Sequence, residues 1–412
     1  KGRKEAVRMK LLILGGGASG MMAALSAAES QDCEITLIER QGRVGRKLMA
    51  TGNGRCNLTN LHTDETRYHG DHPDFVRRAL GSFDVDKTLA FFHRLGLYTV
   101  VEPDGKVYPL SDQANSVVDV LRFALEQRGV CVTTSCDILR AGKAREGFVL
   151  ESATGERFVG DKLIVACGGC AGKTLGGTRA GYRLLASFGH TVTELRPSLV
   201  QIRSDAPFLR SFKGVRAQCR LSLKADGRTI ASECGEIQFT DYGVSGPVAF
   251  SLSRGVLPDG KDQLLLLDLL RETGETALFS SLRARCEAFP DLETEHLLTG
   301  MLNTRLGQTV VKVCDLPLRE PLSALSDSDL QRLSHLLKFF PIPVTGLLGM
   351  EHAQVTAGGV DTSEFRADTL ESRIVPGLFA TGELLDIDGD CGGFNLQWAW
   401  SSGYVAGKLG NL

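Results

Sequence analysis

Three glycines near the N-terminus have a spacing that can create a phosphate-binding turn. Gly15, Gly17 and Gly20 follow the apolar residues 11–14, which are typical of a buried parallel strand. Gly15 permits a tight turn, Gly17 lets a pyrophosphate approach the backbone, and Gly20 lets the next helix lie close to the strand. That helix would present free N–H groups and a positive dipole end to phosphates. The glycine spacing alone is weak evidence, but together with the strand, the helix and the acid Glu39 it favours a dinucleotide site over an ordinary structural turn.

An acid and then a basic segment follow this turn. Glu39 ends a second predicted strand, residues 35–38, where an acid can accept hydrogen bonds from ribose hydroxyls. Residues 43–47 read Arg-Val-Gly-Arg-Lys, and residues 51–57 read Thr-Gly-Asn-Gly-Arg-Cys-Asn. Basic and small turn residues at this point can wrap a long cofactor and neutralise its phosphates. The alternative is a solvated basic loop.

Two turns near the C-terminus carry groups for the other end of such a cofactor. A predicted strand, residues 377–380, leads to Gly382 and Glu383, and this acid can bond the hydroxyls of a ribityl chain. Residues 392–397 then open a helix expected over 398–409. A helix N-terminus aimed at a flavin ring stabilises the negative charge that develops on reduction. These turns favour FAD over a pyridine nucleotide, although residues 392–393 alone also suit a structural turn.

The cysteines and histidines do not indicate a metal site. Eleven cysteines, an odd number in a long chain, indicate reduced thiols rather than a disulfide framework. Cys167 and Cys170 have the C-x-x-C spacing of a redox pair or half a zinc site. No second C-x-x-C completes such a site, and Cys167 ends an apolar strand, so packing is the favoured interpretation. Cys131 and Cys136 are also interpreted as packing residues. The eight histidines show no metal-binding spacing.

Length and composition are those of an ordinary globular protein. The 412 residues exceed a single core and predict two or three domains. A net charge of −2 offers no basic face, so we expect no nucleic-acid partner. No apolar run reaches the ~20 residues of a membrane span, and residues 264–270 are better interpreted as a strand. We therefore expect a cytoplasmic protein without a membrane partner, with Met9 as the natural start and residues 1–8 as an upstream extension.

The hydrophobic pattern divides the chain. A βαβ unit is expected over residues 9–40, and Asp84 is a plausible N-cap. Further helices are expected over residues 73–80, 84–95, 116–128 and 181–188, and strands over 107–109, 130–134, 148–150, 157–159 and 162–166. Residues 191–267 alternate in short segments, as in a half-buried antiparallel domain. Residues 271–336 are helical in pattern, and residues 353–412 return to glycine-rich turns, which indicates a nucleotide-binding domain split by a long insertion.

These motifs resemble those of the bacterial HI0933-like flavoproteins, a family that includes aminoacetone oxidase and 3-dehydro-bile-acid Δ4,6-reductase types. The resemblance extends over nearly the whole chain from Met9. It is carried by residues 15–20, 45–48, 51–60, 107–111, 239–247, 356–360, 386–389 and 392–399. The blocks 52–60 and 392–398 are the most specific.

The resemblance implies an α/β fold with a split Rossmann-type FAD-binding domain, an inserted antiparallel β-barrel-like domain and a small helical domain. The implied segments are 9–190 and 353–412 for FAD binding, 191–270 and 337–352 for the barrel-like domain, and 271–336 for the helical insertion. It also implies an FAD site that comprises Gly15, Gly17, Ala18, Ser19, Gly20, Glu39, Arg46, Lys47, Ile138, Gly382, Glu383, Gly393, Asn395 and Leu396, with the Ile138 backbone at the adenine. One departure concerns residues 178–181, which read Thr-Arg-Ala-Gly where the family usually has Thr-Gly-Asp-Gly.

The resemblance implies an FAD-dependent oxidoreductase, and three functions follow as alternatives. The first is an NAD(P)H-dependent reductase of a conjugated C=C bond, with a bile-acid or steroid enone as the small-molecule substrate. The second is an amine oxidase that uses O₂, and the third is a flavin-containing RNA-associated or binding protein. No catalytic acid or base is identified by a motif, and Tyr242 and Arg55 are candidates for protonating and polarising an enone. The sequence does not indicate an oligomeric state.

Overall fold

The structure is a computed structural model that describes residues 8–257 and 262–410. The chain divides into two compact units. The first unit comprises residues 1–196 and 354–412, and the second unit comprises residues 197–353. The expectation about residues 1–8 falls almost wholly outside the described residues, and the division into five segments stays a prediction.

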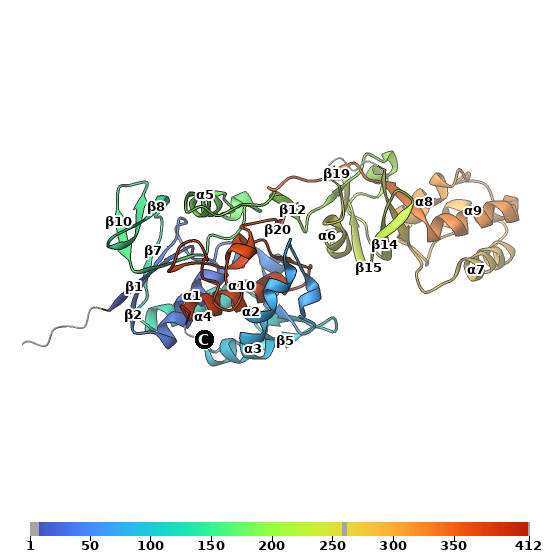
Figure 1. Ribbon diagram of the computed structural model, residues 1–412. Coiled ribbons are helices and arrows are strands. Elements are labelled where there is room, and N and C mark those ends of the chain that lie inside the picture. Colours follow the sequence, from blue (N-terminus) through green and yellow to red (C-terminus); the bar gives the residue numbers. More distant parts are fainter. Residues whose placement is uncertain (1–7, 258–261, 411–412) are drawn as a thin grey trace, which may run out of the picture. The chain divides into compact units, whose positions relative to one another are not determined.

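The first unit is built on a five-stranded parallel sheet (Figure 1). Leu11, Ile13, Leu163 and Ile164 are fully buried within it, as expected for a sheet covered on both faces. From one edge to the other the strands are β21 (Leu378–Ala380), β11 (Lys162–Val165), β1 (Met9–Leu14), β2 (Cys33–Ile38) and β7 (Cys131–Thr133). In chain order this is 5-4-1-2-3, the Rossmann arrangement, whose order reverses between β1 and β11. The predicted Rossmann-type domain is confirmed.

Two helices lie against each other beside this sheet: α1 (Ala18–Ser30) and α10 (Phe394–Gly407) (Figure 1). A Cβ atom on Gly403 would lie 2.4 Å from the Ser19 carbonyl oxygen, and one on Gly407 would lie 2.4 Å from the Ala23 oxygen. Because both contacts advance by four residues, the helices run parallel at a distance that only glycine permits. The helix expected from residue 398 begins earlier, at Phe394, since Gly393 is its left-handed N-cap.

The remaining helices of the first unit are α2 (Val76–Ser82), α3 (Val85–Arg94), α4 (Ala114–Gln127) and α5 (Ala180–Ser187). The Asp84 side chain accepts from the Lys87 N–H and caps α3, as the sequence predicts. Its small sheets contain β3 (Thr59–Asn60), β5 (Thr99–Val101) and β6 (Lys106–Pro109); β4 (Tyr68–His69) and β22 (Asp388–Gly389); and β8 (Ile138–Ala144), β9 (Gly147–Ser152) and β10 (Arg157–Gly160). Strand β8 was not predicted, because its residues are mostly exposed. Strands β12 (Arg196–Ser198) and β20 (Val355–Ala357) lie near the change of unit.

The second unit contains a seven-stranded antiparallel sheet. Its order is β18 (Phe340–Pro343), β17 (Gln263–Asp268), β14 (Arg216–Ala225), β15 (Arg228–Phe239), β16 (Gly243–Ser245), β13 (Ile202–Arg203) and β19 (Gly346–Leu347). Strands β18 and β19 are its edges, and no pairing closes the sheet between them among the described residues. The barrel-like form is therefore not confirmed.

Helices complete the second unit and share one hydrophobic core with its sheet. They are α6 (Pro247–Ser253), α7 (Glu275–Ala288), α8 (Thr304–Val313) and α9 (Asp327–Lys338). Leu282, Leu306 and Leu333 are fully buried with sheet residues Leu221 and Leu265. Within residues 8–257 and 262–410, no helix has the length and apolar character needed to cross a bilayer.

Candidate functional site

A pocket in the first unit lies where β1, β2 and β11 end. Leu14, Ile38 and Ala166, at or just after the carboxyl ends of these strands, line it. This is the switch point of the parallel sheet, where open α/β sheets bind their ligands. Of the residues predicted to bind FAD, eleven line the pocket: Gly15, Gly17, Ala18, Ser19, Glu39, Arg46, Lys47, Ile138, Glu383, Asn395 and Leu396. Gly20, Gly382 and Gly393 do not belong to the lining.

The glycine turn has the geometry that its spacing predicts. Gly15 has φ of +112°, and a Cβ on it would lie 2.3 Å from the Ala166 carbonyl oxygen. A Cβ on Gly20 would lie 1.9 Å from the Gly15 oxygen, so α1 can begin close to the turn only with glycine there. Gly17, the N-cap of α1, lines the pocket and has no atom of the described residues within 4 Å of its Cβ position. The first N–H groups of α1 are thus next to open space, as phosphate binding requires.

Glu39 is held beside this turn by two backbone groups. Its Oε2 accepts from the Gly16 N–H at 2.7 Å, and its Oε1 accepts from the Gln41 N–H at 2.7 Å. Each carboxylate oxygen has two lone pairs, so both retain capacity for a ribose hydroxyl. The carboxylate is therefore fixed in the pocket wall and still able to accept hydrogen bonds.

Lys47 and Glu383 meet across 336 positions of sequence. Lys47 Nζ lies 2.7 Å from Glu383 Oε2, and both side chains line the pocket. Two of the three ammonium protons remain for a ligand. Arg46 lies nearby in the lining and donates from Nη1 to Gln41 Oε1 at 2.6 Å. The sequence placed these residues at one site but did not predict that Lys47 and Glu383 pair with each other.

A second helix N-terminus reaches the same pocket through Asn395 and Leu396 of α10. Gly393 has φ of +102°, and a Cβ on it would lie 2.6 Å from the Thr59 carbonyl oxygen. The Asn395 side chain accepts from the Gly389 N–H at 2.8 Å and donates to the Gly389 oxygen at 2.7 Å. Its amide thus fastens the preceding loop and leaves the backbone N–H groups of the first turn to face a ligand.

The two helix N-termini are offset along the pocket. Ser19 is the second residue of α1, and the Gly403 that it contacts is the tenth residue of α10. In parallel helices this places the start of α10 about eight residues, or ~12 Å, beyond the start of α1. A ligand with two separate groups that favour positive dipole ends fits this spacing, as an FAD with its pyrophosphate and its ring does.

Two cysteines, Cys136 and Cys167, line the pocket, and neither forms a disulfide with another described residue. They line it together with Ile138, and no disulfide links any of the eleven cysteines, all of which lie in the described part of the chain. Burial raises the pKa of Cys167 to about 12, and its Sγ donates to the Leu14 oxygen at 3.6 Å. A thiol with a raised pKa is a poor nucleophile. Cys170 is buried, whereas Cys167 lines the pocket, so the packing interpretation of this pair stays a prediction.

Sequence reasoning missed part of the lining. Gln354 and Val355 line the pocket, as do Gly168, Gly169 and residues 175–178. Residues 356–360 were singled out only as carriers of the family resemblance. Their glycines were the available signal, since Cβ atoms on Gly358 and Gly359 would lie 2.1 and 2.5 Å from backbone atoms.

The two candidates for substrate chemistry lie outside the pocket lining. Arg55 ion-pairs with Asp112 and, at 3.0 Å, with Glu102, and its guanidinium lies 4.0 Å from the centre of the Tyr108 ring. These contacts anchor residues 51–57. Tyr242 belongs to the second unit, is 38% exposed, and follows β15 in a turn whose backbone bonds Ser204. The catalytic roles of both residues stay predictions.

One group of possible metal ligands was not predicted. Glu293, Glu295 and His296 in the second unit have ligand atoms within 4.8 Å of one another. They lie at or near the surface, and His296 Nε2 lies 3.7 Å from Glu295 Oε1. Exposed carboxylates at this spacing also occur without an ion, so we assign no metal to them.

The pocket fits FAD in its chemistry. It combines a glycine turn open to a phosphate, a fixed carboxylate, a cation and two helix N-termini. Together with the parallel sheet, these features define the class as a Rossmann-type, FAD-dependent oxidoreductase. The sequence profile described as the HI0933-like protein Rossmann domain matches residues 9–409, and the chain belongs to this family.

Relatives extend over almost the whole chain. The 3-dehydro-bile acid delta(4,6)-reductase of Clostridium scindens is 39% identical and covers 96% of this chain and 97% of its own. The ribosomal RNA dihydrouridine synthase of Escherichia coli is 30% identical, and the match covers 97% of this chain and 98% of that protein. Among solved structures, the open conformation of a flavocytochrome c3 fumarate reductase matches with a TM-score of 0.47 and 14% identity. It covers 98% of this chain and 78% of that one.

Proposed function

We propose that this protein is an NAD(P)H-dependent flavoprotein reductase of a C=C bond conjugated to a carbonyl, with a steroid-like or bile-acid-like enone as substrate. The observation that carries the proposal is the 39% identity, over 96% of the chain, to a reductase whose name describes that reaction. The pocket supports it, because its groups suit a bound flavin. In the overall reaction the double bond gains a hydride at the β-carbon and a proton at the α-carbon. One NAD(P)H is oxidised for each bond reduced.

Bound FAD supplies two-electron transfer between the nicotinamide and the substrate. The residues of the chain hold it and set its electrostatics. In the proposal, the N-terminus of α1 binds the pyrophosphate, Glu39 accepts from a ribose, and Lys47 and Glu383 bind oxygen groups between the two helix ends. The N-terminus of α10 would bind at the flavin ring and favour the negative charge that develops on reduction. Gly20 and Gly393 allow close approach of neighbouring backbone, and Gly382 allows close approach of the Ser19 side chain. The Ile138 backbone would lie at the adenine.

A second candidate has a specific observation in its favour. Two relatives named ribosomal RNA dihydrouridine synthase, at 30% and 27% identity, match over nearly the full length. Dihydrouridine forms by reduction of a uracil C=C bond conjugated to a carbonyl, so both candidates need the same bond chemistry. The expectation that nucleic acid is not a partner is therefore not confirmed. The net charge of −2 remains an argument for the small enone.

One anaerobic experiment separates the candidates. FAD-loaded protein is mixed with NADH or NADPH, and bleaching of the flavin is followed before a 3-oxo-4,6-diene steroid acid is added. Rapid reoxidation with formation of the saturated product supports the proposal. A reduced flavin that the enone does not reoxidise, together with dihydrouridine formed in a uridine-containing ribosomal RNA fragment, overturns it in favour of the RNA reaction. In a separate aerobic assay, peroxide formed from aminoacetone would instead indicate an amine oxidase.

A further inference from the structure

We propose that Thr356 is a positioning residue for the FAD site, and that it clips the Glu383 carboxylate to the turn after β11. The proposal rests on FAD binding in the pocket described above. Thr356 is 1% exposed and lies in β20, outside the set of residues predicted to contact the cofactor. Its contacts join segments that are far apart in the sequence.

The hydroxyl of Thr356 has its full complement of partners. Its Oγ1 accepts from the Cys170 N–H and from the Ala171 N–H, each at 3.0 Å, and lies 3.9 Å from Cys170 Sγ. A hydroxyl offers two acceptor positions and one donor, so all three are used. The two amides belong to the turn that follows β11 and includes Gly168 and Gly169 of the pocket lining.

The backbone of Thr356 binds the Glu383 carboxylate, while its side chain binds the turn after β11. Its N–H donates to Glu383 Oε1 at 2.9 Å, while Glu383 Oε2 accepts from Lys47 at 2.7 Å. One residue therefore fixes a carboxylate of the pocket wall and the turn beside it. Tyr182 adds a long contact from its hydroxyl to the Glu383 carbonyl oxygen, at 3.5 Å.

Gly169 lies so close to the Thr356 hydroxyl and the Glu383 carboxylate that only glycine fits there. A Cβ on this residue would lie 2.4 Å from Thr356 Oγ1 and 2.4 Å from Glu383 Oε1. Any side chain there would separate the hydroxyl from the carboxylate. This contact gives a reason for the glycine in the C-x-x-C segment that neither redox nor zinc chemistry supplies.

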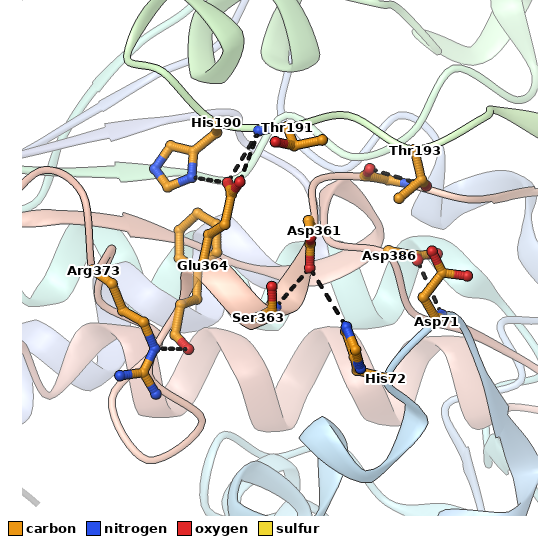
Figure 2. Close-up of polar contacts among 12 residues, drawn as sticks. Asp71, His72, His190, Thr191, Thr193, Asp361, Ser363, Glu364, Arg373 and Asp386 are labelled. Carbon is orange, nitrogen blue, oxygen red and sulfur yellow. Dashed lines mark hydrogen bonds and ion pairs between the residues drawn. The ribbon is translucent and has the colours of Figure 1, made fainter.

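The segment that begins with Thr356 is itself anchored at its far end, which Figure 2 shows. We call residues 356–364 the strap. Gly359 N–H donates to Thr193 Oγ1 at 2.9 Å, and Asp361 lies 3.9 Å from His72 Nε2. Glu364 lies 2.7 Å from Nδ1 of the buried His190. Because both ends are fixed, the clip is rigid relative to the pocket and sets where Glu383 meets a ligand.

Two variants of similar shape test the proposal in the full-length protein. Thr356→Val removes the hydroxyl and leaves the Cys170 and Ala171 amides unpaired, whereas Thr356→Ser keeps the oxygen. The matched control is Thr362→Val, since Thr362 is also 1% exposed and its Oγ1 has no hydrogen-bond partner among the described residues. FAD affinity is measured by titrating FAD-stripped protein and following flavin fluorescence, and the bound flavin is examined by visible circular dichroism.

We expect Thr356→Val to raise the Kd for FAD at least tenfold and to change the flavin dichroism. Thr356→Ser and Thr362→Val should stay within threefold of the wild type with unchanged dichroism. An unaffected Thr356→Val variant overturns the proposal, and so does a Thr362→Val variant that weakens FAD equally. If Thr356→Val does not fold, amide hydrogen exchange in the wild type decides, because the Cys170 and Ala171 amides must be protected. If the wild type takes up no FAD, the proposed function fails, while the exchange measurement still tests the clip.

Discussion

The two units of the chain differ in what their close contacts are made of. In the first unit, Cβ atoms on Gly15, Gly20, Gly403 and Gly407 would lie between 1.9 and 2.4 Å from carbonyl oxygens. The pocket therefore depends on backbone lying against backbone. In the second unit, the shared core consists of apolar side chains, and Gly274, like several other glycines there, has no atom of the described residues within 4 Å of its Cβ position.

This difference explains where the sequence is informative. A site made of backbone groups needs glycine at fixed positions, and few other residues satisfy it. A core made of side chains accepts many apolar combinations of similar volume. Gly243 is an exception in the second unit, since a Cβ on it would lie 2.0 Å from the Ile202 oxygen. It falls in residues 239–247, the block of the second unit that carried the family resemblance.

The largest effect is expected where backbone meets backbone. Gly20→Val places a side chain 1.9 Å from the Gly15 oxygen, so α1 must move away from the turn. We expect the Kd for FAD to rise more than a hundredfold, measured by titration and by flavin content after purification. The control is Gly274→Ala in the second unit, where φ is −69° and no neighbour intrudes. An equal loss of FAD in both variants would contradict the contrast between the units.

A core truncation in the second unit should cost stability without affecting the pocket. Phe239 is 1% exposed, and its ring packs edge-to-face against the ring of Phe212, with 4.5 Å between the two ring centres. Phe239→Ala should lower the free energy of unfolding by ~3–5 kcal/mol, the usual cost of removing a buried aromatic ring. The denaturation midpoint should fall while the FAD affinity and dichroism of the folded protein stay unchanged. Ile230→Ala, at a side chain that is 50% exposed, is the control and should change little.

Much of the first unit was predictable, because its signals are local. The glycine spacing, Glu39 and the strand ends predicted the parallel strands and α1, and eleven of the fourteen predicted site residues line one pocket. Helix α10 was predicted to begin at residue 398, because the apolar run starts there. It begins at Phe394, since the left-handed Gly393 can start the helix before that run.

The partnerships were not predictable, because they join positions far apart in the sequence. Nothing local shows that Lys47 pairs with Glu383, or that Thr356 bonds Cys170. The same holds for the second unit, whose alternating segments predicted antiparallel strands but not whether the sheet closes. Sheet closure depends on strand tilt and register, and these are set by contacts between distant strands.

A smaller, pH-dependent effect is expected at the far end of the strap. Burial raises the pKa of Glu364, but hydrogen bonds from Thr191 and the contact with His190 outweigh it and leave the pKa below its ordinary value. A lowered folded-state pKa stabilises the protein above the unfolded-state pKa, and this stabilisation is lost as the pH falls through the folded-state pKa. At pH 7, Glu364→Gln should lower the free energy of unfolding by ~1–3 kcal/mol, typical of hydrogen bonds to a charged group.

The pH series supplies its own control for that variant. Urea unfolding of wild type and Glu364→Gln is compared from pH 7 to pH 3. The difference in the free energy of unfolding between the two proteins should shrink as the Glu364 carboxyl of the wild type becomes protonated. A neutral acid and an amide then make similar contacts. A difference that stays constant down to pH 3 would show that the side-chain shape, and not its charge, anchors the strap.

The smallest effect on stability is expected at an ion pair of the second unit that is as short as the Lys47–Glu383 pair of the pocket. Lys213 and Asp241 in the second unit meet at 2.7 Å, as Lys47 and Glu383 do, but their side chains are 62% and 43% exposed against 32% and 19%. Water screens an exposed pair, so Lys213→Met should change the free energy of unfolding by less than ~1 kcal/mol. It should leave the Kd for FAD unchanged, whereas Lys47→Met should weaken FAD binding. Equal effects on FAD would mean that a lysine lost from either unit acts through overall charge, and the role of Lys47 in the pocket would have to be abandoned.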